Sequence, residues 1–496
     1  MSPPLRSGTA ADRDLSAVLR VVERLQPALE RQDYAGLRAV IGDLVALDAP
    51  MGEQWQALAQ IAADVAELEL ARRAIDLYVD QSGGTPAALY QKAGLLAHAG
   101  AWREADALLR TLPETVPDPV ANAYSRGIAA LNLGRIDEAR RRLEQVTAAR
   151  PQSGAAWLGL TMATDLASEP ALGNRLVDAG RSMDRNAPAD RAAYSYALGN
   201  LLAGRREHAA AFAAFAQGAE RMKAVVNYDR EGDRSQAASA AEGYDAGRIA
   251  ALACQQTEPT RRTIFLTGLP RSGTTLVEQA LTAHSAVSDG AEIGALAVLA
   301  SEVGGLSCPA LAGYLGAGGA APAARLWHRW LDERFGPAGR VVDKSVDTSR
   351  YLGLVAALLP EAPLVWITRD PLDRAWSCFR TNFVGGALPW SYDLEDIAAH
   401  FRLEDQLLAQ WREILGPRLL VVPYEALVAD PDAWIGKVLT HCGLAEEPAA
   451  FVPHENPRPV ATASMAQVRR PISQGAVGAA EPYRKFLGSF IEAYYG

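Results

Sequence analysis

The chain has 496 residues, of which 49% are hydrophobic and 22% charged, and its formal net charge is −9. This length suffices for about two to four domains that each bury a core. The negative charge argues against nucleic acid as a bulk partner, because no overall positive field attracts phosphates. We find no apolar run of signal-peptide type near the start and none of membrane-spanning length later. The sequence therefore predicts a cytoplasmic protein without a membrane span.

The first half predicts a helical repeat array. It is rich in Ala, Leu, Arg and Glu, with apolar residues at helical spacing. Identical residues recur 34 positions apart, namely Gly100 and Gly134, Ala105 and Ala139, Leu109 and Leu143, and Pro117 and Pro151. Trp55 and Trp157 are three such periods apart. This pattern resembles the tetratricopeptide repeat and predicts about five helical hairpins between residues 51 and 223.

The chain divides into three parts by its sequence pattern. Residues 1–225 are expected to form the repeat array, with a further helical pair or a cap at 13–48, and residues 226–260 a polar helical linker. Such an array stacks a continuous core, and its concave face either binds a partner or substrate segment or packs on the second domain. Residues 261–496 are expected to form an α/β domain.

The α/β domain is predicted from short apolar runs that alternate with helical stretches. The runs are residues 263–267, 340–342, 364–368 and 419–422, each followed by a turn signal. Runs of this kind are typical of a buried parallel sheet. The four cysteines, Cys254, Cys308, Cys378 and Cys442, lie far apart without metal-ligand or redox spacing, and we expect no metal.

One loop carries most of the functional argument. Residues 266–276 read LTGLPRSGTTL, a P-loop pattern between a predicted strand and helix in which Thr274 stands where the lysine belongs. Backbone N–H groups and the helix dipole favour an anion here. The expected anion-binding residues are Pro270, Arg271, Ser272, Gly273, Thr274 and Thr275. A kinase or nucleotidase would need the missing lysine on its triphosphate.

The segment PRSGTTL resembles the phosphosulfate loop of sulfotransferases that use PAPS, 3′-phosphoadenosine 5′-phosphosulfate. In those enzymes an arginine that ends a strand and a serine eight residues later bind the ribose 3′-phosphate. Arg369 and Ser377 match this spacing. Either residue alone has a plain structural explanation, but the pair downstream of such a loop favours a donor site.

Together with the repeats, residues 51–490 resemble the bacterial tetratricopeptide-repeat sulfotransferases, whose catalytic domain is similar to that of tyrosylprotein sulfotransferases. The resemblance implies Glu292 as the catalytic base, with Asp289 as the alternative. It also implies Lys344 beside the bridging oxygen and Tyr424, in VPYEAL, as a cofactor contact.

The C-terminal segment matches the family pattern in part. Ser464, Arg469 and Arg470 lie in a segment that resembles T-x-S-x-x-Q-V-R-x-P-I, and we expect them at the cofactor. Ala479 and Ala480 stand where the family has a basic residue and a tryptophan that cover the nucleotide.

The sequence thus predicts transfer of a sulfuryl group from PAPS to a hydroxyl, without a metal. The acceptor is a peptidyl tyrosine, a carbohydrate or a small molecule, and the array offers a surface for a protein partner. Two alternatives remain open, a repeat scaffold with a degenerate nucleotide-binding domain and a P-loop kinase or nucleotidase.

Overall fold

The computed structural model describes residues 10–184, 187–456, 458 and 469–496. The first half is helical, as expected. Its α-helices are α1 (Ala10–Val22), α2 (Leu25–Glu30), α3 (Tyr34–Ala46), α4 (Gln54–Asp64), α5 (Leu68–Gln81), α6 (Pro86–His98), α7 (Trp102–Thr111), α8 (Pro119–Asn132), α9 (Ile136–Ala149), α10 (Gly154–Ala163), α11 (Pro170–Ala179), α12 (Pro188–Gly204) and α13 (His208–Lys223).

Consecutive helices of this half pack in pairs: α4 with α5, α6 with α7, α8 with α9, and α12 with α13. The fourth unit is less regular, because the 3-10 helices η1 (Leu166–Ser168) and η2 (Gly180–Ser182) flank α11, and α10 packs directly on α12. The assignment to tetratricopeptide repeats stays a prediction.

The repeated residues have equivalent roles in successive pairs. Gly100 and Gly134 adopt positive φ angles of 81° and 75° in the turns after α6 and α8, a conformation that glycine adopts without strain. Trp55 and Trp157 are both buried, and each indole N–H donates to a carbonyl six residues upstream, at 3.0 and 2.9 Å. The 34-residue period therefore reflects a repeated packing solution.

The second half contains a five-stranded, fully parallel sheet of order β2-β3-β1-β4-β5. The strands are β1 (Thr263–Thr267), β2 (Val287–Ala291), β3 (Arg340–Asp343), β4 (Leu364–Thr368) and β5 (Leu419–Pro423). The four strands predicted from apolar runs are confirmed. Strand β2 was not predicted, because at the sheet edge it carries the polar residues Ser288 and Asp289.

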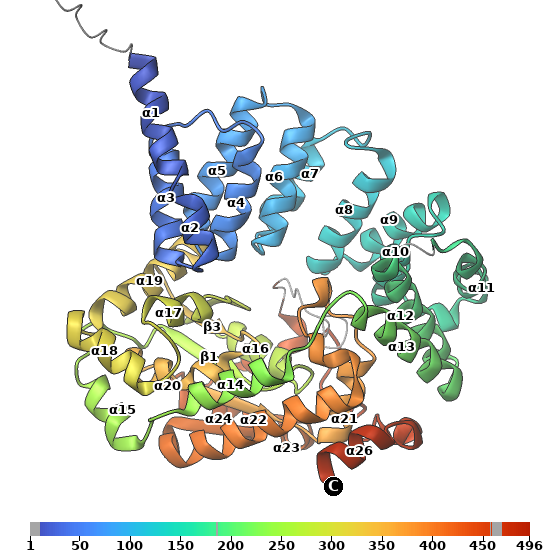
Figure 1. Cartoon of the computed structure of the whole chain (residues 1–496). Helices are drawn as coiled ribbons and strands as arrows, with labels where there is room; N and C mark the ends of the chain where they lie inside the picture. The colour runs from blue at the N-terminus through green and yellow to red at the C-terminus, as the bar shows by residue number, and fades with distance from the viewer. Residues whose placement is uncertain (1–9, 185–186, 457, 459–468) are drawn as a thin grey trace, which may run out of the picture.

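Helices cover both faces of the sheet (Figure 1). They are α14 (Arg230–Ala241), α15 (Ala246–Ala253), α16 (Thr274–Thr282), α17 (Leu296–Glu302), α18 (Cys308–Gly318), α19 (Ala321–Phe335), α20 (Thr348–Leu358), α21 (Pro371–Phe379), α22 (Leu394–Leu415), α23 (Tyr424–Ala429), α24 (Pro431–Cys442) and α26 (Gly488–Tyr495). Short 3-10 helices are η3 (Val384–Gly386), η4 (Pro389–Tyr392), η5 (Gly416–Arg418), η6 (Pro448–Phe451), η7 (Pro453–Glu455) and η8 (Glu481–Phe486).

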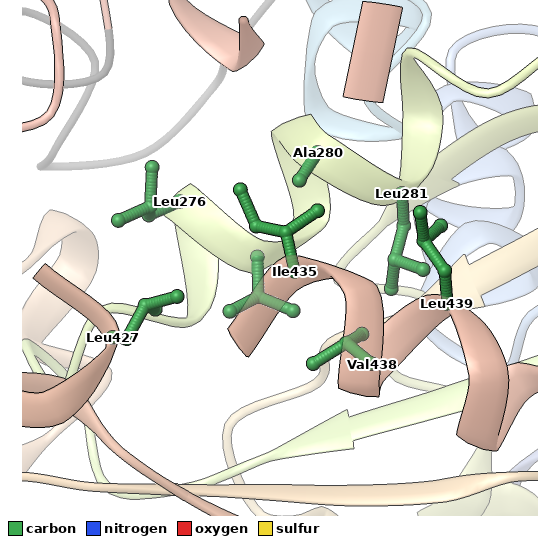
Figure 2. A pocket seen from close by; sticks show the side chains of 8 residues that line it. Leu276, Ala280, Leu281, Leu427, Ile435, Val438 and Leu439 are labelled. Carbon is green, nitrogen blue, oxygen red and sulfur yellow. The ribbon is translucent and has the colours of Figure 1, made fainter. Parts of the chain in front are cut away.

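The strand side chains alternate between two cores. Phe265, Val341 and Trp366 face a core formed with α19, α20 and α22, whereas Ile264 and Val342 face α16 and α24. Figure 2 shows apolar side chains of α16, α23 and α24 around a small cavity, which is lined by Leu276, Val277, Ala280, Leu281, Leu427, Ile435, Val438 and Leu439. These side chains carry no polar atom, so the cavity is a packing gap behind the loop helix.

The expected linker is part of the α/β unit, because α14 packs on α20 and α22. The buried guanidinium of Arg350 lies 2.9 Å from Asp233 of α14 and 2.8 Å from Glu404 of α22. Within the described part of the chain, no helix is both long and apolar enough to cross a membrane.

The helical array forms an arc that meets the α/β domain at both ends (Figure 1). At the first end, buried Glu67 accepts hydrogen bonds from Arg329 at 2.7 and 2.8 Å and from the Trp330 indole at 3.1 Å. At the second end, α13 packs on η4 and η8, and Lys223 lies 2.5 Å from Asp393. The array is therefore fixed at two places.

The first attachment is tested by Glu67→Gln, which removes the buried carboxylate that Arg329 and Arg38 share. Hydrogen bonds to charged groups contribute about 1.5–3 kcal/mol, so we expect the free energy of unfolding in urea to fall by about 2 kcal/mol. Glu104→Gln is the matched control, because its pair with Arg72 is largely exposed and should contribute less than about 1 kcal/mol. Equal losses in the two variants would contradict a buried anchor.

The same variant has a defined pH dependence. Burial would raise the pKa of Glu67, but hydrogen bonds from Arg329 and Trp330 outweigh burial and lower it below 4.5. A lowered folded pKa stabilises the protein above the unfolded pKa, and this stabilisation is lost as pH falls through the folded pKa. The difference in unfolding free energy between wild type and Glu67→Gln should therefore shrink below about pH 4.

Candidate active site

The loop between β1 and α16 is shaped by its glycines. Gly268 and Gly273 have φ angles of 141° and 104°, in the region that favours glycine. A Cβ at position 268 would lie 2.4 Å from the carbonyl oxygen of Ile367, and one at position 273 would lie 2.5 Å from the ring of Tyr424. Both positions therefore exclude any side chain, which lets the backbone pass close to β4 and α23.

Hydroxyl groups of the loop lie at the start of α16. Thr274 and Thr275 are its first two residues, so their backbone N–H groups lie at the positive end of the helix dipole. The Ser272 hydroxyl is buried and makes no hydrogen bond to any described residue. A buried unpaired hydroxyl in a strand-to-helix turn is the feature that a bound anion would satisfy.

Arg369 and Ser377 both contact the loop, from the end of β4 and from α21. Arg369 donates to the carbonyl oxygen of Arg271 at 2.9 Å and lies over the Tyr424 ring at 4.9 Å. The Arg271 Nε donates to the Ser377 Oγ at 3.0 Å. Arg369 and Ser377, eight residues apart in the sequence, thus both contact Arg271 of the loop.

A third guanidinium, that of Arg380, joins this group. Burial lowers the pKa of Arg271 to about 10, and repulsion from Arg380 and Arg369 adds to the effect. Burial also lowers the pKa of Arg380, which lies over the Trp376 ring at 6.0 Å. Mutually repelling cations in a poorly solvated place favour a multivalent anion between them.

The carboxylate of Asp373 is near these cations but is used elsewhere. It lies 4.0 Å from Arg369, and its two oxygens accept the backbone N–H groups of Gly478 at 2.7 Å and Ala480 at 2.8 Å. Arg369 also donates to the carbonyl oxygen of Ala476 at 2.5 Å. Residues 476–487, here called the cover segment, are thus held over the cluster through their backbone.

Lys344 and Glu292 form an ion pair on the other side of the loop. Phe265 of β1 is opposite Asp343 of β3, so Lys344 follows β3 at the sheet edge where the loop begins. Its buried Nζ lies 2.6 Å from the carboxylate of Glu292, whose side chain is 48% exposed. Burial would lower the pKa of Lys344, but Glu278 and Glu292 outweigh it and raise the pKa.

Glu278 extends this ion pair into a small network. Its buried carboxylate lies 3.9 Å from Lys344 and 3.1 Å from Arg458. Arg458 also donates to Asp289. Asp289 of β2, the alternative base, therefore pairs with Arg458 and Glu292 pairs with Lys344, and the two carboxylates are similarly exposed, at 44% and 48%.

The structure does not gather all the expected residues. Ser464 lies outside the described residues. Arg469 donates to the backbone oxygens of Asn456 and Arg458, and Arg470 is exposed. The described contacts therefore place neither arginine in the Arg369 cluster.

Three residues of the site were not predicted from the sequence. Arg380 lies three positions after Ser377, a spacing that could have indicated it on a short helix. Glu278 is a buried charged residue of α16. A charged residue among the apolar residues of this predicted helix is the signal that could have indicated it. Asp373 accepts hydrogen bonds from backbone N–H groups, and such partners cannot be recognised from a sequence pattern.

Comparison with known proteins bears on this domain. Residues 263–300 and 319–448 match the sequence model of the sulfotransferase family. An uncharacterized protein of Aquifex aeolicus is 27% identical over 323 residues, which are 61% of this chain and 41% of that protein. The chain thus spans about two fifths of the length of this relative.

Two solved structures are similar over part of the chain. The sulfotransferase domain of the Synechococcus PCC 7002 olefin synthase has a TM-score of 0.33 and 17% identity, over 48% of this chain and 97% of that one. Sulfotransferase STF1 of Mycobacterium tuberculosis H37Rv has a TM-score of 0.27 and 14% identity, over 66% and 99% of the chains. The sequence match to the sulfotransferase family thus lies within the α/β part of the chain.

Proposed function

We propose that the protein transfers a sulfuryl group from PAPS to an acceptor hydroxyl. The observation that carries this proposal is the convergence of Arg271, Arg369 and Arg380 with Ser377 beside a lysine-free phosphate loop. A donor with one 5′-phosphosulfate and one separate 3′-phosphate presents two anions. The molecule offers two anion sites of matching kind, the loop backbone and the arginine cluster.

The donor site is assigned residue by residue. The backbone N–H groups of residues 271–275 and the Ser272 hydroxyl bind the 5′-phosphosulfate. The arginine cluster and Ser377 bind the 3′-phosphate, since charge-assisted hydrogen bonds from arginine suit phosphate geometry. Tyr424 lies over Arg369 and packs at Gly273, so it fixes both groups. The proposal gives Arg469 and Arg470 no role at the donor.

Glu292 and Lys344 perform the transfer. The donor supplies an electrophilic sulfur whose bond to the bridging phosphate oxygen breaks as the acceptor oxygen attacks. Glu292 accepts the acceptor's hydroxyl proton, and Lys344 stabilises the negative charge that develops on the bridging oxygen. In the structure the two side chains neutralise each other at 2.6 Å. Movement of Lys344 toward the donor therefore frees the Glu292 carboxylate to act as base.

The acceptor is a hydroxyl of the peptidyl-tyrosine, carbohydrate or small-molecule class. Glu292 fits each of them, because its partly exposed carboxylate is open to an incoming hydroxyl. The helical array spans the domain from α17 and α19 to η8 and offers a long surface for a peptide or protein partner.

Donor binding is tested by calorimetry with adenosine 3′,5′-bisphosphate, the product of the donor. Arg380→Ala removes a charge-assisted contact worth about 1.5–3 kcal/mol, so we expect the Kd to rise about tenfold to hundredfold. Arg369→Ala should weaken binding at least as much, because Arg369 also holds the loop and Tyr424.

Arg470→Ala is the matched control, since this exposed arginine lies in the same domain, and its Kd should match that of wild type. Absence of bisphosphate binding by wild type would contradict the proposed function. Equal losses in Arg380→Ala and Arg470→Ala would contradict the assigned cluster.

The transfer step is tested by Glu292→Gln, which keeps the size of the side chain and removes its basicity. General base catalysis contributes about 10²–10⁴-fold, so kcat should fall by that factor while the Kd for the bisphosphate stays unchanged. Turnover is followed with ³⁵S-labelled PAPS and a panel of tyrosine peptides, sugars and phenols.

Asp289→Asn serves as the control for Glu292→Gln. This substitution affects the carboxylate tied to Arg458 and should lower kcat less than tenfold. A larger loss in Asp289→Asn than in Glu292→Gln would reassign the base to Asp289.

A further inference from the structure

Helix α21 has one face with polar contacts and one face with apolar contacts. Asp373 and Ser377, four residues apart, face the cover segment and the loop arginine. Leu372, Trp376 and Phe379, on the neighbouring face, belong to an apolar core cluster. Because one short helix carries both faces, a displacement of its apolar face moves the residues at the donor site.

The apolar face of α21 packs against the last helix of the array, not against the α/β domain alone. The Phe212 ring of α13 stacks on Phe379 at 5.6 Å and on Trp376 at 6.1 Å. Phe215 meets the same tryptophan edge-on at 5.6 Å. The indole is almost fully buried, with 1% of its surface exposed.

The cover segment is built into the same aromatic cluster. Tyr483 stacks on Trp376 with a centroid distance of 3.8 Å, and Phe486 stacks on Phe212 at 4.9 Å. The His208 ring of α13 meets the edge of Tyr483 at 5.0 Å. Helix α13 thus contacts both α21 and the cover segment, while Asp373 joins these two through backbone hydrogen bonds.

We infer that the last hairpin of the array is part of the donor site, and that Phe212 is a positioning residue for the 3′-phosphate. Phe212 acts through Trp376 and Phe486 by fixing the position of α21 relative to the cover segment. In this arrangement Ser377 lies beside Arg271, and the cover segment contacts Arg369. The inference rests on the proposed function, because it concerns the same arginine cluster.

The arrangement also explains how the cover segment acts without the side chains expected at positions 479 and 480. Ala480 is buried, and its backbone N–H donates to Asp373. A larger side chain there would meet the aromatic cluster. The cover segment is held by its backbone hydrogen bonds and by its contacts with α13. These interactions substitute for the basic residue and the tryptophan that are absent.

The test compares two nucleotides in calorimetry, adenosine 3′,5′-bisphosphate and adenosine 5′-monophosphate, which lacks the 3′-phosphate. For Phe212→Ala we expect the Kd of the bisphosphate to rise about fivefold to tenfold and that of the monophosphate less than about twofold. Phe212→Leu keeps an apolar contact and should restore most of the affinity. A purely structural role would weaken both nucleotides alike.

Tyr90→Ala is the matched control. Tyr90 is a partly buried aromatic of α6, whose main contacts are with the neighbouring helices α4, α5 and α7, so the Kd of both nucleotides should be unchanged. Equal binding of the bisphosphate to wild type and Phe212→Ala, with the fold intact, would overturn the inference.

Hydrogen exchange gives a readout that does not depend on any nucleotide. The amides of Gly478 and Ala480 should exchange faster in Phe212→Ala than in wild type or Tyr90→Ala, because their acceptor Asp373 moves with α21. Unchanged exchange at both amides would overturn the inference even if no nucleotide binds. If wild type binds no bisphosphate but the exchange difference appears, the proposed function fails and the mechanical link stands.

Discussion

The repulsion among three guanidinium groups is the constraint on which this molecule's second half depends. Arg271, Arg369 and Arg380 are brought together by three separate elements, in surroundings poor in water that strengthen every charge interaction. Their mutual repulsion alone would drive them apart. The backbone of the loop, α21 and the cover segment each contact one of these cations, so a bound anion would reduce the repulsion among them.

The opposite side of the loop follows a complementary rule. Lys344 is buried and remains charged because two glutamates surround it, and one of these, Glu278, is itself held by Arg458. The other, Glu292, is the more exposed and therefore the freer partner. Buried pairs contribute little net stability, since desolvation offsets their attraction. Their value here is positional, because the lysine is kept charged at the edge of the sheet without an anion being bound.

The sequence predicted those parts of the molecule that follow a local rule. Strands β1, β3, β4 and β5 are apolar runs, and the 34-residue period marks turns and buried tryptophans that recur in space. Edge strand β2 escaped prediction because its residues are polar or small and only two of the five are buried. The spacing of Arg369 and Ser377 led to the arginine cluster, but Arg380, Glu278 and Asp373 depend on tertiary contacts that no short pattern encodes. The same limit applies to Arg469, which bonds to a neighbouring backbone and not to the cluster.

The attachment of the array at both ends restricts how such a protein can change its length. A free solenoid tolerates one hairpin more or less, because each unit contacts only its neighbours. Here the chain is anchored at Glu67 and again at Phe212, and the units between them must bridge a fixed distance. Loss or duplication of a single hairpin would leave one anchor out of reach. The number of hairpins in this array is therefore fixed by its two attachments, so that a gain or loss of one hairpin would be harmful and not neutral.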